Sequence, residues 1–405
     1  MGKIRLIIAT SLVLIISLGA GCTPEHSFDS RLSSIVKPYR FSIIDWEMKV
    51  LLTGDGPSVT QEGEDELSQV REYFSLVERV DALKSEIEVL NTDGRQGDLA
   101  SLKAELELLE EQQAAVAGVV GGIIKKQIED TLAEQGILNP VDEYIKLETH
   151  FPPLNFKLEQ PPYLLVISPR NRIDSIREIP LRQDISLEEI EAIEAEVDRL
   201  GVSSLVVELG GFAGTYPTFV ANDASLQFVI CTATEEWLHQ YLVFKPLGFL
   251  YLLDVTGISR DYDIATINEA VAGMVSKEIG AIVYQKYFTQ HENGNNQIEE
   301  AGFDFNQEMR EIRRTVDGYL AQGEIELAEG FMEQKRWYLA SRGYYIRKLN
   351  QAYFAFHGTY ADRPTSISPI GSELETLRGQ SDSLKDFLDT VAAMTSRQDL
   401  IGSIG

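Results

Sequence analysis

Two glutamates and a histidine in one short segment are the residues whose types and spacing could do chemistry. Glu235 and His239 stand four positions apart in the segment Thr232–Tyr241, and Glu236 directly follows Glu235. On an α-helix, residues four apart lie on the same face, whereas the next residue lies about 100° round the axis. Carboxylate oxygens and imidazole nitrogens both bind divalent metal ions. The spacing predicts two ligands, Glu235 and His239, beside a carboxylate that can take up a proton.

The residues around this motif indicate whether it is buried. A helix is predicted over about 225–244, and apolar side chains cover it nearly all round: Leu226, Phe228, Val229, Ile230, Leu238, Leu242 and Val243. Such a helix is expected to be buried, and buried carboxylates need hydrogen-bond partners or a metal ion. Three interpretations stay open here: a metal site, a metal-free relic of one, or a chance pattern on a solvated face.

A second motif, Asn268-Glu269-Ala270, falls near the start of the next long helix, predicted over about 264–288. Together the two motifs resemble those of the gluzincin metallopeptidases. Within that group they resemble a bacterial aminopeptidase family with a His-Glu-x-x-His-Gln helix followed by Asn-Glu-x-x-Ala. The order of motifs agrees over about 225–360, where Glu311–Arg314 and Tyr344–Ala352 are similar to that family's later helical segments.

The resemblance implies a zinc-metallopeptidase-like domain that hydrolyses peptides. Its metal ligands would be Glu235, His239 and Glu269, with Glu236 as the general base. The family places a tyrosine or histidine near the reacting carbonyl. Tyr345 is the first candidate for that position, and Tyr344 and Tyr360 are the others.

Two features depart from the family pattern. Glu235 stands where the family has histidine, and the interval between His239 and Glu269 is longer than usual. The interval contains the apolar run Phe249–Leu253, which we expect to form a short helix or a loop. Because a second carboxylate replaces an imidazole, the ligand set also suits harder ions such as Mn or Mg, so another divalent ion stays open beside zinc.

The elements that must position these residues predict an α+β fold, mainly α, with a small sheet. Strands are predicted over 163–168, 204–209 and 216–220, and we expect the edge near Val206–Leu209 to pair with an extended peptide. Further helices are predicted over 304–321, 323–341, 343–360 and 381–395, with a loop over 362–380. The metallopeptidase-like domain is assigned to 138–405. Apolar spacings near 3.5 predict a helical hairpin or coiled coil over 61–137.

The N-terminus has the pattern of an export signal. Lys3 and Arg5 precede an apolar stretch that ends in Gly19-Ala20-Gly21-Cys22. This order predicts a signal peptide over 1–21 and resembles a bacterial lipobox, which implies lipidation of Cys22. Residues 22–60 would then be a tether between the membrane and the folded part. An uncleaved anchor helix and an ordinary signal peptide are the alternatives, and all three place the chain outside the cytoplasm.

The net charge of the protein limits the kinds of partner that it can bind. The 405 residues include 36 basic and 63 acidic side chains, for a net charge of −27. This composition argues against nucleic acid, whose binding requires clustered Lys and Arg. The expected partners are a peptide substrate and the membrane that holds the lipid anchor. A different class of protein is also possible: a catalytically inactive envelope lipoprotein that binds a partner through its helical hairpin.

Overall fold

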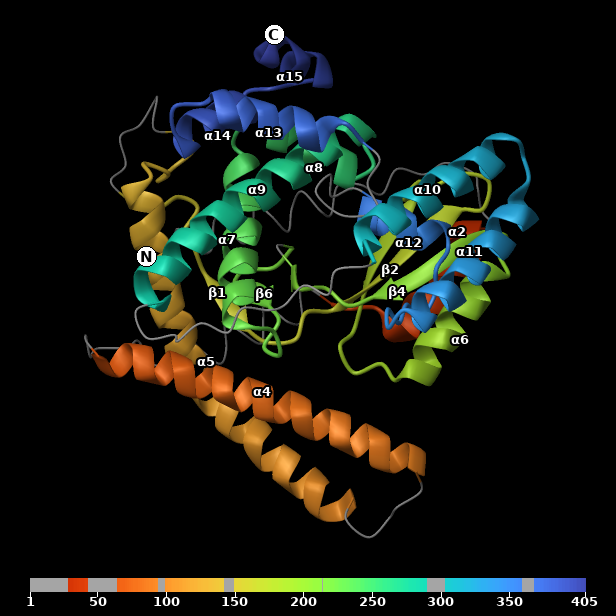
Figure 1. The fold of residues 1–405 in the computed structure, drawn as a ribbon, viewed down its shortest axis with the longest axis horizontal. Helices are drawn as coiled ribbons and strands as arrows, with labels where there is room; N and C mark the ends of the chain where they lie inside the picture. The colour runs from red at the N-terminus through yellow and green to blue at the C-terminus, as the bar shows by residue number, and fades with distance from the viewer. Residues whose placement is uncertain are drawn as a thin grey trace.

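The computed structural model describes residues 28–42, 64–93, 99–141, 149–212, 214–289, 303–358 and 368–405. The predicted signal peptide, Cys22 and the rest of the tether lie outside these ranges, as does Tyr360. Helices dominate the described residues, together with two three-stranded sheets (Figure 1), which confirms a mainly α fold with a small β component. None of the described helices combines the length and the apolar composition needed to span a membrane.

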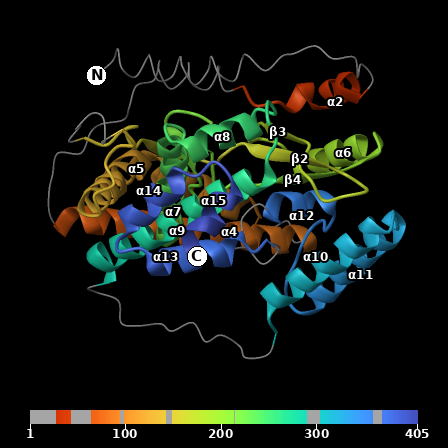
Figure 2. The same cartoon turned by 90° about the horizontal axis from the view of Figure 1, so that it is seen from above.

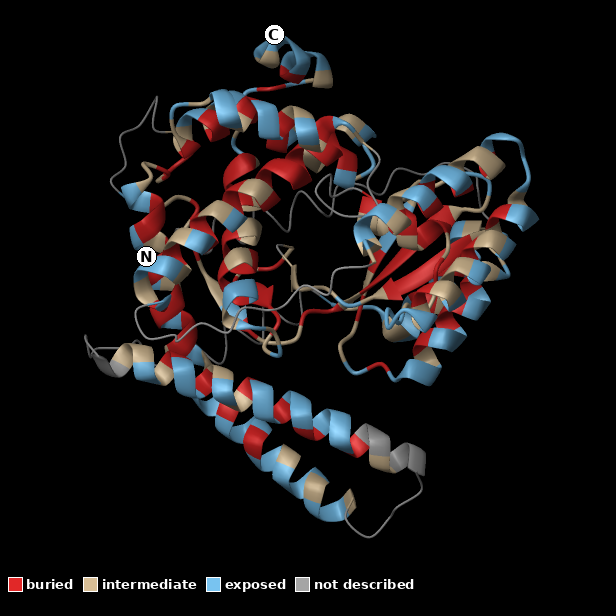
Figure 3. Cartoon of the chain, viewed as in Figure 1, coloured by how far each residue is buried: buried red, intermediate tan, exposed pale blue. Residues whose placement is uncertain are grey.

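Helices α4 (Glu64–Asp93) and α5 (Leu99–Glu134) form the predicted hairpin (Figure 1). In its outer part, the buried side chains form a cluster of their own: Val80, Leu83, Ile87 and Leu109. The second half of α5, from Val120 to Leu132, instead belongs to the largest core of the molecule. Figure 3 shows exposed surface along the outer hairpin. One end of the hairpin therefore packs into the main core, while the apolar side chains of its outer part pack against one another.

The largest core forms where α7 (Leu226–Leu242) packs against α9 (Tyr262–Tyr287) and α5. Figure 3 shows α7 and α9 as mostly buried. Each large apolar side chain buried in this core contributes roughly 1.5–3 kcal/mol. The connection between the two helices contains a third, α8 (Pro246–Val255), so the long interval of the sequence folds as a helix.

Helix α7 begins where the sequence supplies a cap, because Ser225 accepts a hydrogen bond from the backbone N–H of Phe228. Asp261 caps α9 in the same way, from the N–H of Ile264. Such caps stabilise a helix end by about 1 kcal/mol.

The C-terminal part of the chain is more helical than the sequence suggests. Residues 362–380 were expected to be a loop, yet α13 (Ile370–Gln380) is a helix. Its buried side chains, Ile370, Leu374 and Leu377, recur at helical spacing and pack into the core beside α9. Tertiary packing here outweighs the local Pro, Ser and Gly content. Helices α14 (Leu384–Ala392) and α15 (Arg397–Ile404) complete this layer.

The first sheet has the order β3-β2-β4. Its central strand β2 (Tyr163–Pro169) is antiparallel to both β3 (Arg177–Leu181) and β4 (Val202–Val207). Helices α2 (Phe28–Val36) and α6 (Leu187–Asp198) pack on one face. The 3-10 turn η1 (Lys37–Tyr39) follows α2.

Helix α12 (Gln351–Gly358) packs on the opposite face of this sheet. The antiparallel pair α10 (Phe305–Ala321) and α11 (Ile325–Ser341) packs outside it. Figure 2 shows α2 and these helices on opposite sides of the sheet.

The second sheet has the order β1-β6-β5 and lies next to α7. Strand β6 (Thr218–Val220) is parallel to β1 (Phe156–Leu158) and antiparallel to β5 (Gly211–Phe212). The described residues place no further strand beside β5 on the side away from β6.

The prediction of a helix over 343–360 is wrong for its first half. Helix α11 ends at Ser341, Gly343 has a positive φ of 90°, and the helix resumes only at Gln351. The chain between them makes hydrogen bonds to the outer edge of β4. Arg347 donates to the carbonyl of Val206, and Asn350 donates to the carbonyl of Ser204.

The N–H groups on the same edge of β4 are also bonded, to side chains of α6. The N–H of Val206 donates to Glu194, and the N–H of Ser204 donates to Asp198. Since this edge is occupied by side chains, the expectation that the strand near Val206–Leu209 pairs with a peptide is not supported.

Candidate metal centre

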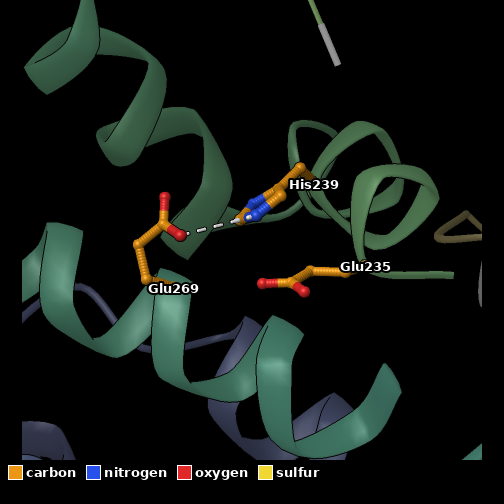
Figure 4. A group of neighbouring side chains, drawn as sticks. All are labelled: Glu235, His239 and Glu269. Carbon is orange, nitrogen blue, oxygen red and sulfur yellow. Dashed lines mark ion pairs between the residues drawn. The ribbon is translucent and has the colours of Figure 1, made fainter. Parts of the chain in front are cut away.

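The orientation of α7 is fixed from its buried side. The indole of Trp237 donates to the carbonyl of Pro152 at 2.7 Å, and the hydroxyl of Tyr241 donates to the carbonyl of Asn139 at 3.4 Å. These anchors, together with fully buried Leu238, hold one face of α7 in the core. Glu235 and His239 lie on another face, half-buried and directed toward α9 (Figure 4).

Glu269 of α9 lies close to Glu235 and His239. One ligand atom from each of Glu235, His239 and Glu269 lies within 4.8 Å of the other two. His239 Nε2 lies 3.7 Å from Glu269 Oε2 (Figure 4). The predicted convergence of the three residues is therefore confirmed, although 30 positions separate His239 from Glu269 in the sequence.

The histidine is held with one ring nitrogen free for a ligand bond. His239 Nδ1 lies 2.9 Å from the side-chain oxygen of Asn268. Because that oxygen can only accept, Nδ1 carries the hydrogen, and in the neutral imidazole the lone pair of Nε2 is then directed at Glu269. Metal-binding histidines are commonly fixed in this way by a second hydrogen bond.

Charge around His239 favours its protonated form when no cation is bound. Burial by itself lowers the pKa of His239, but the carboxylates of Glu269, Glu236 and Glu235 raise it, as does the bond to Asn268. The net shift is upward. Three carboxylates around one imidazole create a strongly negative site, which favours a divalent cation.

A buried carboxylate oxygen without a hydrogen-bond partner indicates that the site fits a metal ion. Glu269 is buried, with 7% of its surface exposed, and its Oε2 has no hydrogen-bond partner. An unsatisfied buried carboxylate oxygen is costly, and a cation bound beside His239 Nε2 would satisfy it. The three residues could therefore hold a metal ion. One nitrogen and carboxylate oxygens suit several divalent ions, so the donor set does not by itself specify zinc.

The structure also explains the position of Glu236. Its side chain lies directly beside the backbone of Gly211 in β5, where a Cβ atom would overlap both Glu236 and Thr232. Residue 211 must therefore be small, because β5 passes close over α7 at this point. Glu236 is thus placed between the ligand cluster and β5.

A carboxylate from the other sheet also faces this region. Glu178 of β3 is exposed to solvent, and partial desolvation by the neighbouring protein raises its pKa. The hydrogen bond from Ser175 lowers the pKa of Glu178, and the charge of Glu269 raises it.

Tyr345 does not belong to this cluster. It is 86% exposed and lies in the segment that follows α11. Its neighbour Tyr344 stacks on Phe305 with ring centroids 4.5 Å apart, and Arg347 bonds β4 and Glu194. The segment therefore has a packing role against the first sheet. The prediction of Tyr345 as a catalytic residue is not supported.

Sequence reasoning missed Tyr251, which the structure brings to the site from α8. Its hydroxyl donates to Glu269 Oε1, and its ring stacks on His239 with centroids 5.7 Å apart and planes 24° apart. Tyr251 lies within the apolar run Phe249–Leu253, where the sequence offers no spacing rule that would single it out.

Comparisons of the chain with family models, with curated proteins and with solved structures found no match.

Proposed function

We propose that this chain is an exported, lipid-anchored hydrolase of peptides that uses zinc bound by Glu235, His239 and Glu269. The observation that carries the proposal is the convergence of these three residues, in which a Glu269 oxygen without a hydrogen-bond partner lies 3.7 Å from Nε2 of His239. The order of ligands along the chain supports a metallopeptidase, because two ligands one turn apart on a helix are followed by a glutamate on a later helix.

In this proposal the protein residues have separate tasks. A bound zinc ion supplies a Lewis acid that polarises the scissile carbonyl and acidifies water. Glu236 accepts the proton of the attacking water and passes it to the leaving amine. Asn268 holds the tautomer of His239, and burial of Glu269 keeps its carboxylate from competing water.

The geometry next to Glu236 supports an extended substrate. Strand β5 is an edge strand of its sheet, and Gly211 lies against Glu236. The carbonyl of Gly210 accepts from Ala221 of the neighbouring chain segment, which leaves the backbone of Gly211 directed to the other side of the strand. A peptide pairing there would lie beside the ligand cluster.

Metal content and a single carboxamide variant test this proposal. Zinc should bind the mature protein stoichiometrically, and His239→Ala should abolish that binding. Glu236→Gln should keep the zinc but lower the cleavage of a peptide library by about 10²–10⁴-fold, since it removes only the proton acceptor. If the wild type binds no zinc and cleaves nothing, the enzyme proposal is wrong.

One observation favours a second candidate function, a scaffold that binds an envelope partner. The outer hairpin forms an apolar cluster of its own, and Leu108 in this part is 53% exposed. A protein without metal or activity, whose partner is lost when the outer hairpin is shortened, would support this alternative.

A further inference from the structure

Helix α8 is placed so that it returns to the metal centre directly after α7. Pro246 opens it, and Gly248 lies so close to the backbone of Leu242 that a Cβ atom there would collide with the Leu242 carbonyl. Because glycine permits this close approach, α8 folds back on the end of α7. The fold-back directs Tyr251 at His239.

Tyr251 contacts two of the three ligands at once. Its ring stacks on the imidazole of His239, and its hydroxyl donates to Oε1 of Glu269. The other oxygen of that carboxylate, Oε2, has no hydrogen-bond partner and lies 3.7 Å from His239 Nε2. The hydroxyl therefore occupies one oxygen of Glu269, and the second oxygen is directed into the centre.

We propose that Tyr251 is a positioning residue that fixes the carboxylate of Glu269, so that Oε2 alone is offered to the cation. The inference rests on the proposed metal site and adds a residue to it from the helix between the two motifs. Without the hydroxyl, the carboxylate can rotate about its terminal bond and present either oxygen. Removal of such a partner to a ligand typically weakens metal binding 10–100-fold.

Tyr251→Phe tests the role of the hydroxyl, because it keeps the ring that stacks on His239. Calorimetric titration of the full mature chain with zinc should show affinity lowered by about tenfold or more. Tyr262→Phe is the matched control. Tyr262 lies at the start of α9, and its hydroxyl donates to the carbonyl of Gly358 at 3.2 Å, away from the ligands. The control should keep wild-type affinity.

A second pair of variants separates the loss of the hydrogen bond from the loss of packing by the tyrosine ring. Tyr251→Gln and Tyr251→Leu both remove the ring and are similar in size, but only glutamine keeps a hydrogen-bond donor. If Tyr251 positions Glu269, zinc affinity should be higher in Tyr251→Gln than in Tyr251→Leu, with similar melting temperatures. Equal affinities in the two variants would contradict the inference.

Two further outcomes separate this inference from the proposed function. If the wild type binds zinc and Tyr251→Phe binds it equally well, the metal site stands and the role of Tyr251 is refuted. If the protein loaded with ferric iron shows a phenolate-to-iron absorption band that Tyr251→Phe removes, Tyr251 is itself a ligand and the positioning role is overturned. If the wild type binds no zinc, both proposals fail together.

Discussion

At the scale of the residue, the centre is unusual in its charge. It combines Glu235, Glu269 and the adjacent Glu236 with a single imidazole, His239. Each added carboxylate strengthens the attraction for a cation but makes the bound cation a weaker acid for its water. The charge at position 235 therefore affects both how strongly the site binds a metal ion and how strongly that ion acidifies its water.

Glu235→His should raise zinc affinity, because zinc prefers imidazole nitrogen to carboxylate oxygen and this preference outweighs the lost charge. It should also raise peptide cleavage, because the ligand set loses one negative charge and the ion acidifies its water more strongly. Zinc titration and a peptide-cleavage assay measure these two effects, and thermal unfolding measures the stability of the variant. Glu188→His on the exposed side of α6 controls for an added histidine and should change neither. If Glu235 serves only a structural network, the variant should instead lose about 1–3 kcal/mol of stability and gain no metal.

At the scale of the element, one contact lies beside the site and a second joins the first sheet to α11. The first is the close passage of β5 over α7 at Gly211, beside Glu236. The second is the ion pair between Arg170, which follows β2, and Glu329 of α11, which is made by two hydrogen bonds of 2.8 and 2.7 Å.

Gly211→Ala should destabilise the protein by about 1–3 kcal/mol, since the new methyl group overlaps Thr232 and Glu236 and the helix or strand must shift. It should also lower activity by displacing Glu236. Gly330→Ala in α11 is the matched control, because nothing lies within 4 Å of its added Cβ. The control should be neutral or stabilising by up to about 1 kcal/mol. Denaturant unfolding measures both, and equal effects would contradict the close contact.

The ion pair at Arg170 should contribute to the pH dependence of stability. Hydrogen bonds from Arg170 lower the pKa of Glu329 against the opposing effect of burial, and Gln351 adds another bond. A carboxyl whose pKa is lower in the folded state stabilises the fold above its unfolded pKa of about 4.3. This stability is lost as the pH falls through the folded pKa.

Arg170→Met should therefore reduce the loss of stability between pH 5 and pH 3, measured by denaturant unfolding at each pH. The effect should be under about 1 kcal/mol, because both side chains are about one third exposed. Arg172→Met removes a more exposed pair with Asp174 and should leave the pH profile unchanged. An acid profile of Arg170→Met that matches the wild type would exclude this contribution.

At the scale of the whole molecule, the outer part of the hairpin formed by α4 and α5 projects from the body (Figure 1). Phe28, where α2 begins, is six positions after Cys22. An extended chain spans at most about 3.3–3.6 Å per residue. If Cys22 carries the proposed lipid, α2 lies within about 20 Å of the membrane surface.

Cys22→Ser should release the protein from the membrane fraction, because Cys22 is the residue that would accept the lipid. Fractionation and N-terminal sequencing measure the change, and Cys231→Ser serves as the control that should stay with the membrane. A Cys22→Ser protein that remains in the membrane and still begins at Met1 would identify an uncleaved anchor helix instead.

Local periodicity was enough to predict much of this protein. The spacing of apolar residues placed the hairpin and α7, and the i, i+4 spacing placed Glu235 and His239 on one face, because an α-helix fixes both relations within a few residues. The resemblance of Asn268-Glu269-Ala270 to the gluzincin motif implied Glu269 as the third ligand. These features depend on interactions along a single helix or on short motifs in the amino-acid sequence.

Only the tertiary structure decided which distant residues share the site. Tyr251 reaches Glu269 because α8 folds back on α7, which no local rule predicts. The segment with Tyr345 has no regular secondary structure, since its partners lie far away in sequence: Arg347 bonds Glu194 across 153 positions, and Asn350 bonds Ser204 across 146. Such long-range bonds outweigh helix propensity of well under 1 kcal/mol per residue. They removed Tyr345 from the predicted site, while the fold of α8 added Tyr251 to it.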